Sequence, residues 1–196
     1  FASGSGGASS GAVTTERDTL LVTGGSTDVL DGALAALVAG LRSEPGGWPR
    51  IAVEARLLPG GPVTADHTPP DAGRDRGDVL VAADFSPAGL DRVGLAVARP
   101  GLGIVTELLE RGVPILAVRE DGNRELSHNA GALESLGAGR DLGVLAGPED
   151  AGRVLDSLRG SGSVAHPPDA GDVVGRPAAL ALDGARAVAE RALGSA

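Results

Sequence analysis

The sequence contains no cysteine, methionine, tyrosine or lysine, and it has one tryptophan and two phenylalanines in 196 residues. Without cysteine there is neither a disulfide framework nor thiolate chemistry. The three histidines, His67, His128 and His166, lack the spacing of metal ligands, so we expect no metal site. The scarcity of aromatic residues disfavours a base-stacking surface for single-stranded nucleic acid. A core of Leu, Val, Ala and Ile instead suits a parallel sheet covered by helices.

Charge and hydropathy exclude two further kinds of partner. The formal net charge is −9, and every one of the 17 basic residues other than histidine is an arginine. The chain lacks the dense basic patch that binding to a phosphate backbone requires, so we expect no nucleic-acid partner. No apolar run approaches the ~20 residues of a membrane-spanning helix, so we expect no membrane span.

The chain divides into a tail and one domain. Its start, FASGSGGASSGAVTTER (residues 1–17), is rich in Gly and Ser and is typical of a flexible linker or tail. The first residue is Phe rather than Met, which suggests a fragment or a processed chain. Residues 18–196 are expected to form a single domain of ordinary size. Within it, a Pro-, Gly- and Asp-rich stretch at about residues 57–77 predicts an irregular loop.

Short apolar runs alternate with segments of helical periodicity along this domain. The runs predict strands at Thr19–Thr23, Ile51–Ala55, Val79–Ala82, Gly94–Ala98, Pro114–Val118 and Leu142–Leu145. The periodic segments predict helices at about residues 30–41, 103–111, 124–136 and 178–193, another that opens at 147–150 with Pro148 first, and at most a short one at 87–92. This alternation predicts a Rossmann-like, doubly wound parallel sheet of about six strands.

Ligands of such sheets lie outside the carboxyl ends of the strands. After the first strand, Gly24 and Gly25 let a ligand approach the backbone. Ser26 or Thr27 is expected to cap the next helix, whose free amides would attract an anion. A turn of this kind also needs glycine for steric reasons alone.

The most informative segment runs from Arg99 to Leu133. After the fourth predicted strand, Gly101 and Gly103 begin a helix that carries Glu107 one turn in, where a carboxylate can accept two hydrogen bonds from a ribose diol. An acid early in a helix is also favourable to the helix dipole.

The helix after the fifth strand carries a second polar pair. Glu125 and Asn129 are four residues apart and therefore share a face, whereas Leu126, Ala130 and Leu133 form an apolar stripe. Glu125 can equally be a solvated acid of the first helical turn.

Two motifs carry a resemblance to a known family. RPGLGIVTELLERGVPILAV followed by GNRELSHNAGALESLGAG resembles the carboxyl-terminal, donor-binding half of GT-B glycosyltransferases, particularly the group of the lipid II-forming N-acetylglucosaminyltransferase. The match covers roughly residues 19–160 in order, and its specific motifs lie in residues 99–133. It implies a nucleotide-sugar substrate, with a UDP-sugar as the expected donor, and no other cofactor. It also implies a cytoplasmic protein and an amino-terminal acceptor-binding domain in the same or another chain.

The resemblance also implies roles for individual residues. Gly25 and Ser26 would lie at the diphosphate, beside Gly24, and the helix start at Gly101 and Gly103 would bind phosphate. The ribose hydroxyls would be bound by Glu107 and the sugar hydroxyls by Glu125, and Arg99 belongs to the same donor-binding set. Asn129 would hold its helix to the preceding loop rather than touch the ligand.

The sequence departs from the family at Leu126, where the family usually has Gln. No catalytic residue can be nominated, because the half that carries the usual base is not recognised in the chain. Two other functions therefore stay open: a non-catalytic module of the same fold that binds a nucleotide or a protein, and a fragment of a nucleotide-sugar 2-epimerase, which VREDGNRE faintly resembles.

Overall fold

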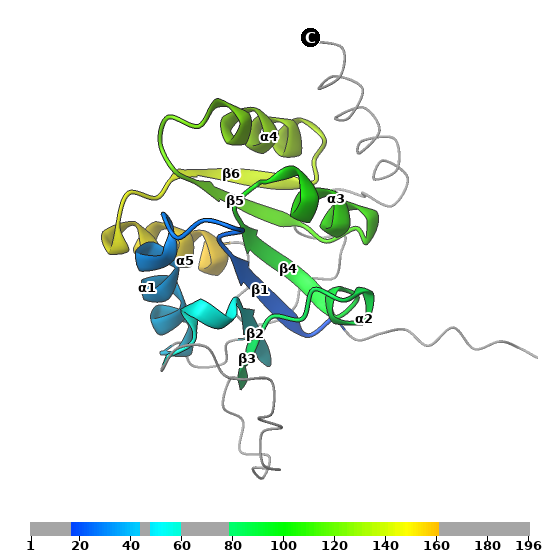
Figure 1. Cartoon of the computed structure of the whole chain (residues 1–196), viewed down its shortest axis with the longest axis vertical. Coiled ribbons are helices and arrows are strands. Elements are labelled where there is room, and N and C mark those ends of the chain that lie inside the picture. Colours follow the sequence, from blue (N-terminus) through cyan, green and yellow to red (C-terminus); the bar gives the residue numbers. More distant parts are fainter. Residues whose placement is uncertain (1–16, 44–47, 60–78, 161–196) are drawn as a thin grey trace, which may run out of the picture.

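Six parallel strands form one sheet in the computed structural model, which describes residues 17–43, 48–59 and 79–160 (Figure 1). The strand order is β3-β2-β1-β4-β5-β6, and every neighbouring pair runs parallel. The predicted fold class is therefore confirmed. The strands are β1 (Thr19–Thr23), β2 (Arg50–Val53), β3 (Val79–Ala82), β4 (Val93–Ala98), β5 (Ile115–Arg119) and β6 (Gly139–Val144).

Helices cover both faces of the sheet. One face carries α1 (Asp31–Arg42) and α5 (Ala151–Gly160), which pack on each other as well as on the strands (Figure 1). The other face carries α2 (Pro87–Leu90), α3 (Leu102–Glu110) and α4 (Arg124–Ser135). Two single turns of 3-10 helix complete the elements, η1 (Ala55–Leu57) and η2 (Pro148–Asp150).

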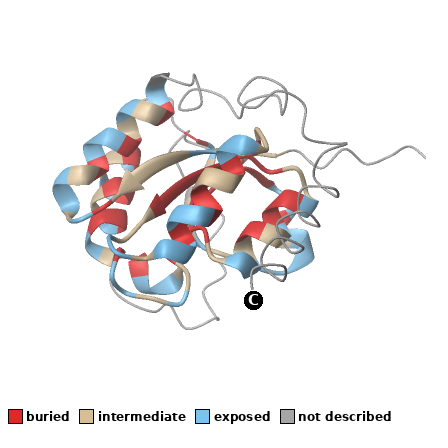
Figure 2. Cartoon of the chain, turned by 90° about the horizontal axis from the view of Figure 1, so that it is seen from above, coloured by how far each residue is buried: buried red, intermediate tan, exposed pale blue. Residues whose placement is uncertain are grey.

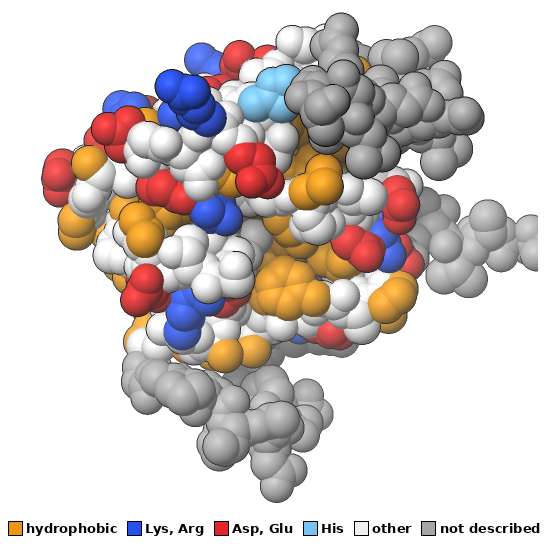
Figure 3. Space-filling model, turned by 45° about the horizontal axis from the view of Figure 1, so that its top comes forward, with side chains coloured by type: hydrophobic (Ala, Val, Ile, Leu, Met, Phe, Trp, Pro, Cys, Tyr) orange, Lys and Arg blue, Asp and Glu red, His pale blue; other side chains and the backbone are white. Residues whose placement is uncertain are grey.

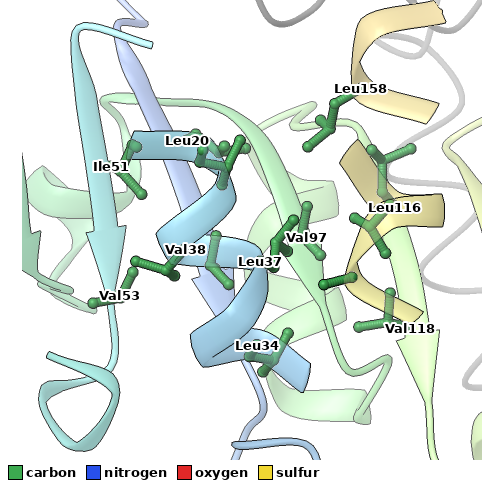
Figure 4. Close-up of a cluster of buried hydrophobic side chains, with 14 of the residues drawn as sticks. Leu20, Leu34, Leu37, Val38, Ile51, Val53, Val97, Leu116, Val118 and Leu158 are labelled. Carbon is green, nitrogen blue, oxygen red and sulfur yellow. The ribbon is translucent and has the colours of Figure 1, made fainter. Parts of the chain in front are cut away.

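The strands divide their side chains between two cores of different character. Alternate residues of a strand point to opposite faces, and the face under α1 and α5 receives branched side chains such as Leu20, Ile51, Val97 and Leu116 (Figure 4). The face under α3 and α4 receives several alanines, including Ala52, Ala96, Ala98 and Ala117.

Each long helix buries the stripe that its sequence period predicted. In α1 the buried residues recur at helical spacing, and in α4 they include Leu126, Ala130 and Leu133 (Figure 2). Leu126 is 1% exposed. The apolar stripe predicted for this helix is therefore confirmed, and Leu126 belongs to the packed side of α4.

Several element boundaries differ from the sequence prediction by one to three residues. The second strand ends at Val53 rather than Ala55, because Ala55 already begins the turn η1. The sixth strand is Gly139–Val144, several residues earlier than predicted, and its pairing with β5 is irregular around Gly143. The first helix, Asp31–Arg42, lies within one residue of its predicted range.

Several predicted segments lie outside the described residues. These are residues 1–16 of the predicted tail, nearly all of the predicted loop at 57–77, and the predicted last helix at 178–193.

Two glycines offer a matched test of the packing. A Cβ added at Gly139 would meet the carbonyl oxygen of Ile115 at 2.2 Å, whereas one added at Gly131, inside α4, would meet nothing within 4 Å. We expect Gly139→Ala to lower the free energy of unfolding by ~1–3 kcal/mol, because backbone must shift. Gly131→Ala should raise it by ~0.5–1 kcal/mol through helix propensity. Urea unfolding measures both, and equal effects would contradict the β5–β6 packing.

Candidate functional site

A carboxylate from the end of β2 holds the turn after β1. Glu54 accepts hydrogen bonds from the Thr23 hydroxyl and, at 2.9 Å, from the amide of Gly25. Its other oxygen forms an ion pair with Arg56 at 2.5 Å, and the side chain is 10% exposed. Gly25 has a φ of +71°, which favours glycine. The amide predicted to meet a diphosphate is therefore already bonded to a protein carboxylate.

Arg56 organises the rest of this turn. Its guanidinium donates to the carbonyl oxygens of Gly25 and Thr27 at 2.9 and 2.6 Å, and its Nε bonds to the Asp31 carboxylate at 2.9 Å. The turn thus continues to Leu30, which precedes α1 without a side-chain cap. The prediction that Ser26 or Thr27 caps this helix is wrong, because Arg56 holds that stretch in a non-helical turn. Ser26 is exposed and not at a helix start.

A second carboxylate is paired with Arg99, which follows β4. The Arg99 guanidinium bonds to both oxygens of Glu120, at 2.9 and 2.7 Å, and the two side chains are 19% and 17% exposed. Asn123 also donates to Glu120 at 3.0 Å. The hydrogen bonds from Arg99 lower the pKa of Glu120 to about 2. In return, Glu120 raises the pKa of Arg99, and the negative charge of Glu125 adds to that rise.

Arg99 joins two of the predicted loops. Its side chain lies about 4 Å from the positions that a Cβ would take on Gly25 and on Gly101. Its amide also donates to the carbonyl oxygen of Thr23 at 3.0 Å. The structure therefore brings the first turn, Arg99 and the start of α3 together at one edge of the sheet.

Asn129 fixes the loop before α3. It is buried, and its amide nitrogen donates to the carbonyl oxygen of Pro100 at 2.8 Å. Asn129 therefore holds its helix to a loop, as predicted, but that loop lies between β4 and α3 and is not the one that precedes α4. The same helix is capped by Asn123, whose side chain accepts from the amide of Leu126 at 3.2 Å.

The start of α3 is open to ligands. Gly101 precedes the helix, and a Cβ on Gly103 would meet nothing within 4 Å. Glu107 is the sixth residue of α3, with a side chain that is 53% exposed and paired with Arg111 at 2.9 Å. The explanation of Glu107 by the helix dipole fails, because that effect fades within the first turn.

An open cavity of about 700 Å³ lies at this edge of the sheet. Polar groups from the first turn form part of its wall and α3 forms another part, with apolar side chains from the β3–α2 connection between them. Figure 3 shows hydrophobic side chains near the middle of the visible face, flanked by acidic and basic ones. The cavity is lined by Thr23, Gly25, Glu54, Ala55, Arg56, Ala83, Phe85, Leu90, Ile104 and Glu107.

The structure separates the eight predicted donor-binding residues into groups. Gly25 and Glu107 line the cavity, whereas Gly24 is buried behind the turn. Arg99 and Gly101 lie beside that turn, and Gly103 is exposed at the start of α3. Glu125 is exposed in the first turn of α4. No contact with a nucleotide is tested for any of them, so their donor-binding roles stay predictions.

Sequence reasoning missed four residues of this region: Glu54, Arg56, Phe85 and Glu120. Phe85 is 47% exposed although it is one of only two phenylalanines in the chain, which could have marked it as a ligand contact. Glu54 and Glu120 directly follow the observed strands β2 and β5, but the predicted second strand ran to Ala55 and so placed Glu54 inside it.

Residues 17–43, 48–59 and 79–160 contain neither a candidate metal site nor a candidate membrane-spanning helix. Among them no three His, Cys, Asp or Glu side chains are grouped to hold a metal ion. His128, the one histidine in these ranges, is exposed on α4. None of the described helices is long and apolar enough to span a membrane.

The Glu120–Arg99 pair predicts a specific acid sensitivity. Folding lowers the pKa of Glu120 from 4.5 to about 2, so the pair stabilises the fold above pH 4.5 and loses this contribution as the pH falls toward 2. We expect Glu120→Gln to make unfolding less pH-dependent in that window. Urea titrations at several pH values measure the slope, with the exposed Glu110→Gln as control. Identical slopes for both variants would contradict the pairing.

Leu126 gives a test of the α4 packing. Because Leu126 is 1% exposed, Leu126→Gln should bury an amide without partners and lower the free energy of unfolding. The expected loss is ~1–3 kcal/mol. The control, Leu126→Met, nearly conserves volume and should cost less than about 1.5 kcal/mol. A Gln variant as stable as the Met variant would show that position 126 faces the solvent.

Comparison with known proteins places the fold. No protein-family model and no curated protein matches the sequence. Among solved structures, the calicheamicin glycosyltransferase CalG4 aligns with a TM-score of 0.55 and 18% identity, over 91% of this chain and 43% of that chain. MurG of Acinetobacter baumannii aligns with a TM-score of 0.50 and 17% identity, over 81% of this chain and 45% of that chain.

These identities establish the fold alone, and the chain spans less than half the length of either glycosyltransferase. The six-stranded parallel sheet with its flanking helices has the Rossmann-like fold of one half of a GT-B glycosyltransferase.

Proposed function

We propose that this chain binds the nucleotide part of a sugar donor, as the donor-binding half of a GT-B glycosyltransferase. One observation carries the proposal: Glu107 lines an open cavity of about 700 Å³ at the carboxyl edge of the sheet, together with apolar side chains. Ligands of doubly wound sheets bind at this edge. The fold similarity to CalG4 and MurG supports the same assignment.

The wall chemistry suits a nucleoside. A carboxylate can accept hydrogen bonds from both hydroxyls of a ribose diol, and Arg111 holds the Glu107 carboxylate at 2.9 Å. Phe85, which is 47% exposed, and the half-buried Ile104 supply apolar surface for a flat base. From the ribose, a phosphate would reach toward the amides at the start of α3, a favourable place for an anion. The resemblance of the motifs favours uridine as the nucleoside and a UDP-sugar as the donor.

Sugar transfer requires more than this cavity. We propose that the acceptor is held by a second half, in the same or another chain, and that the assembled enzyme works in the cytoplasm. Catalysis needs both reactants in near-attack geometry. We therefore expect this chain by itself to bind a nucleotide sugar without transferring the sugar, with Glu125 contacting the sugar hydroxyls.

One observation favours a second candidate, a non-catalytic nucleotide-binding module. Leu126 is buried at the position where the resembling enzymes usually carry Gln for the donor sugar. On α4, Glu125 therefore lacks the neighbouring amide that would help it to bind the sugar. The two candidates differ in whether the sugar adds affinity. A UDP-sugar that binds no better than UDP supports the module, and tighter binding that Glu125→Ala abolishes supports the donor half.

The Glu107 prediction tests the nucleoside site. Glu107→Ala should weaken UDP binding by ~1.5–3 kcal/mol, the usual scale for a hydrogen bond to a charged group. Its melting temperature should hardly change, because an exposed ion pair between residues four apart contributes only ~0.3–0.5 kcal/mol. Isothermal titration calorimetry gives the affinities.

The matched control is Glu110→Ala, which removes an exposed acid from the same helix outside the cavity lining. Equal UDP affinity in both variants would remove Glu107 from the site.

A further inference from the structure

Glu54 stands where an anionic ligand would be expected. We propose that Glu54 is a specificity-determining residue that fills the anion position of the Gly24–Gly25 turn, so that the site gains little affinity from a second phosphate. The inference rests on the proposed nucleotide function and concerns which part of the nucleotide contributes binding affinity at that site.

The contacts of Glu54 show why the turn is already filled. Its carboxylate accepts hydrogen bonds from the Gly25 amide at 2.9 Å and from the Thr23 hydroxyl. It also forms an ion pair with the Arg56 guanidinium at 2.5 Å. These are the donor types that bind a phosphate group in a glycine turn. A ligand phosphate at the Gly25 amide would have to share that donor with a carboxylate, and the two like charges would repel in a largely buried place.

The start of α3 offers a contrasting environment. Gly103 is open there, and Glu107, one turn further, belongs to the same cavity as Glu54. A phosphate next to a ribose held by Glu107 meets helix amides, whereas a second phosphate directed at the first turn meets Glu54. The cavity therefore distinguishes the two phosphates by position.

Glu54→Gln should reverse this preference. The amide oxygen of Gln can still accept from Gly25 and Thr23, but the amide nitrogen cannot pair with Arg56. The change removes the repelling charge and releases Nη1 of Arg56, which can then bind a phosphate. Asp31 and the carbonyl oxygens of Gly25 and Thr27 keep the guanidinium in place.

The experiment measures the affinity of the full chain for uridine, UMP and UDP by calorimetry. In the unaltered chain we expect UMP and UDP to differ by less than about threefold, because repulsion offsets the second phosphate. Glu54→Gln should raise the preference for UDP over UMP by about tenfold, near the energy of one screened charge pair at close range. Glu110→Gln removes an equal charge outside the cavity and should leave the ratio unchanged.

Each outcome decides between the inference and the function on which it rests. Unaltered chain that binds UDP at least about tenfold more tightly than UMP overturns the role of Glu54 and leaves the nucleotide site standing. The same holds if Glu54→Gln folds and keeps the original ratio. Failure of uridine, UMP and UDP all to bind overturns the inference and the proposed function together. If Glu54→Gln does not fold, the ratio in the unaltered chain decides alone.

Discussion

Parallel pairing of all six strands is the constraint on which the site depends. It places the carboxyl end of every strand at one edge of the sheet, where the chain leaves through turns whose amides and carbonyls are not paired within the sheet. At this edge the chain satisfies many of those groups with its own charged side chains. Glu54 and Arg56 hold the turn after β1, and Asn129 holds the loop after β4 through the carbonyl oxygen of Pro100. The edge is thus built before any ligand arrives.

This internal pairing gives the edge an unusual electrostatic character. Among the described residues, Arg56 and Arg99 lie beside the first turn, and they form ion pairs with Glu54 and Glu120 respectively. Positive charge is therefore compensated where a diphosphate would lie. The remaining attraction for an anion comes from helix amides at α3, while Glu107 and the apolar wall favour the uncharged nucleoside. If the proposed nucleotide binds here, we expect its ribose and base contacts to contribute more affinity than its phosphate charge.

Periodicity along the chain was enough to predict the fold. The strand and helix order and the buried stripe of α4 depend on local patterns or on spacing within one helix. The tie from Asn129 to Pro100 spans 29 residues, and its prediction came from the family resemblance. Glu54 and Glu120 were missed because their importance comes from partners 29 and 21 residues away, Gly25 and Arg99. The wrong cap of α1 has the same cause, since Arg56 of another element bonds to the backbone of the turn that precedes this helix.

The most direct test of the central claim is a backbone-amide NMR titration of the isotope-labelled chain with UDP. The account predicts that shift changes gather at Phe85, at residues 101–107 and in the first turn, which border one cavity. Amides of α5, on the opposite face of the sheet, should stay unchanged. Shift changes gathered on α5, or at the opposite end of the strands around Arg50 and Arg92, would contradict a nucleotide site at the carboxyl edge.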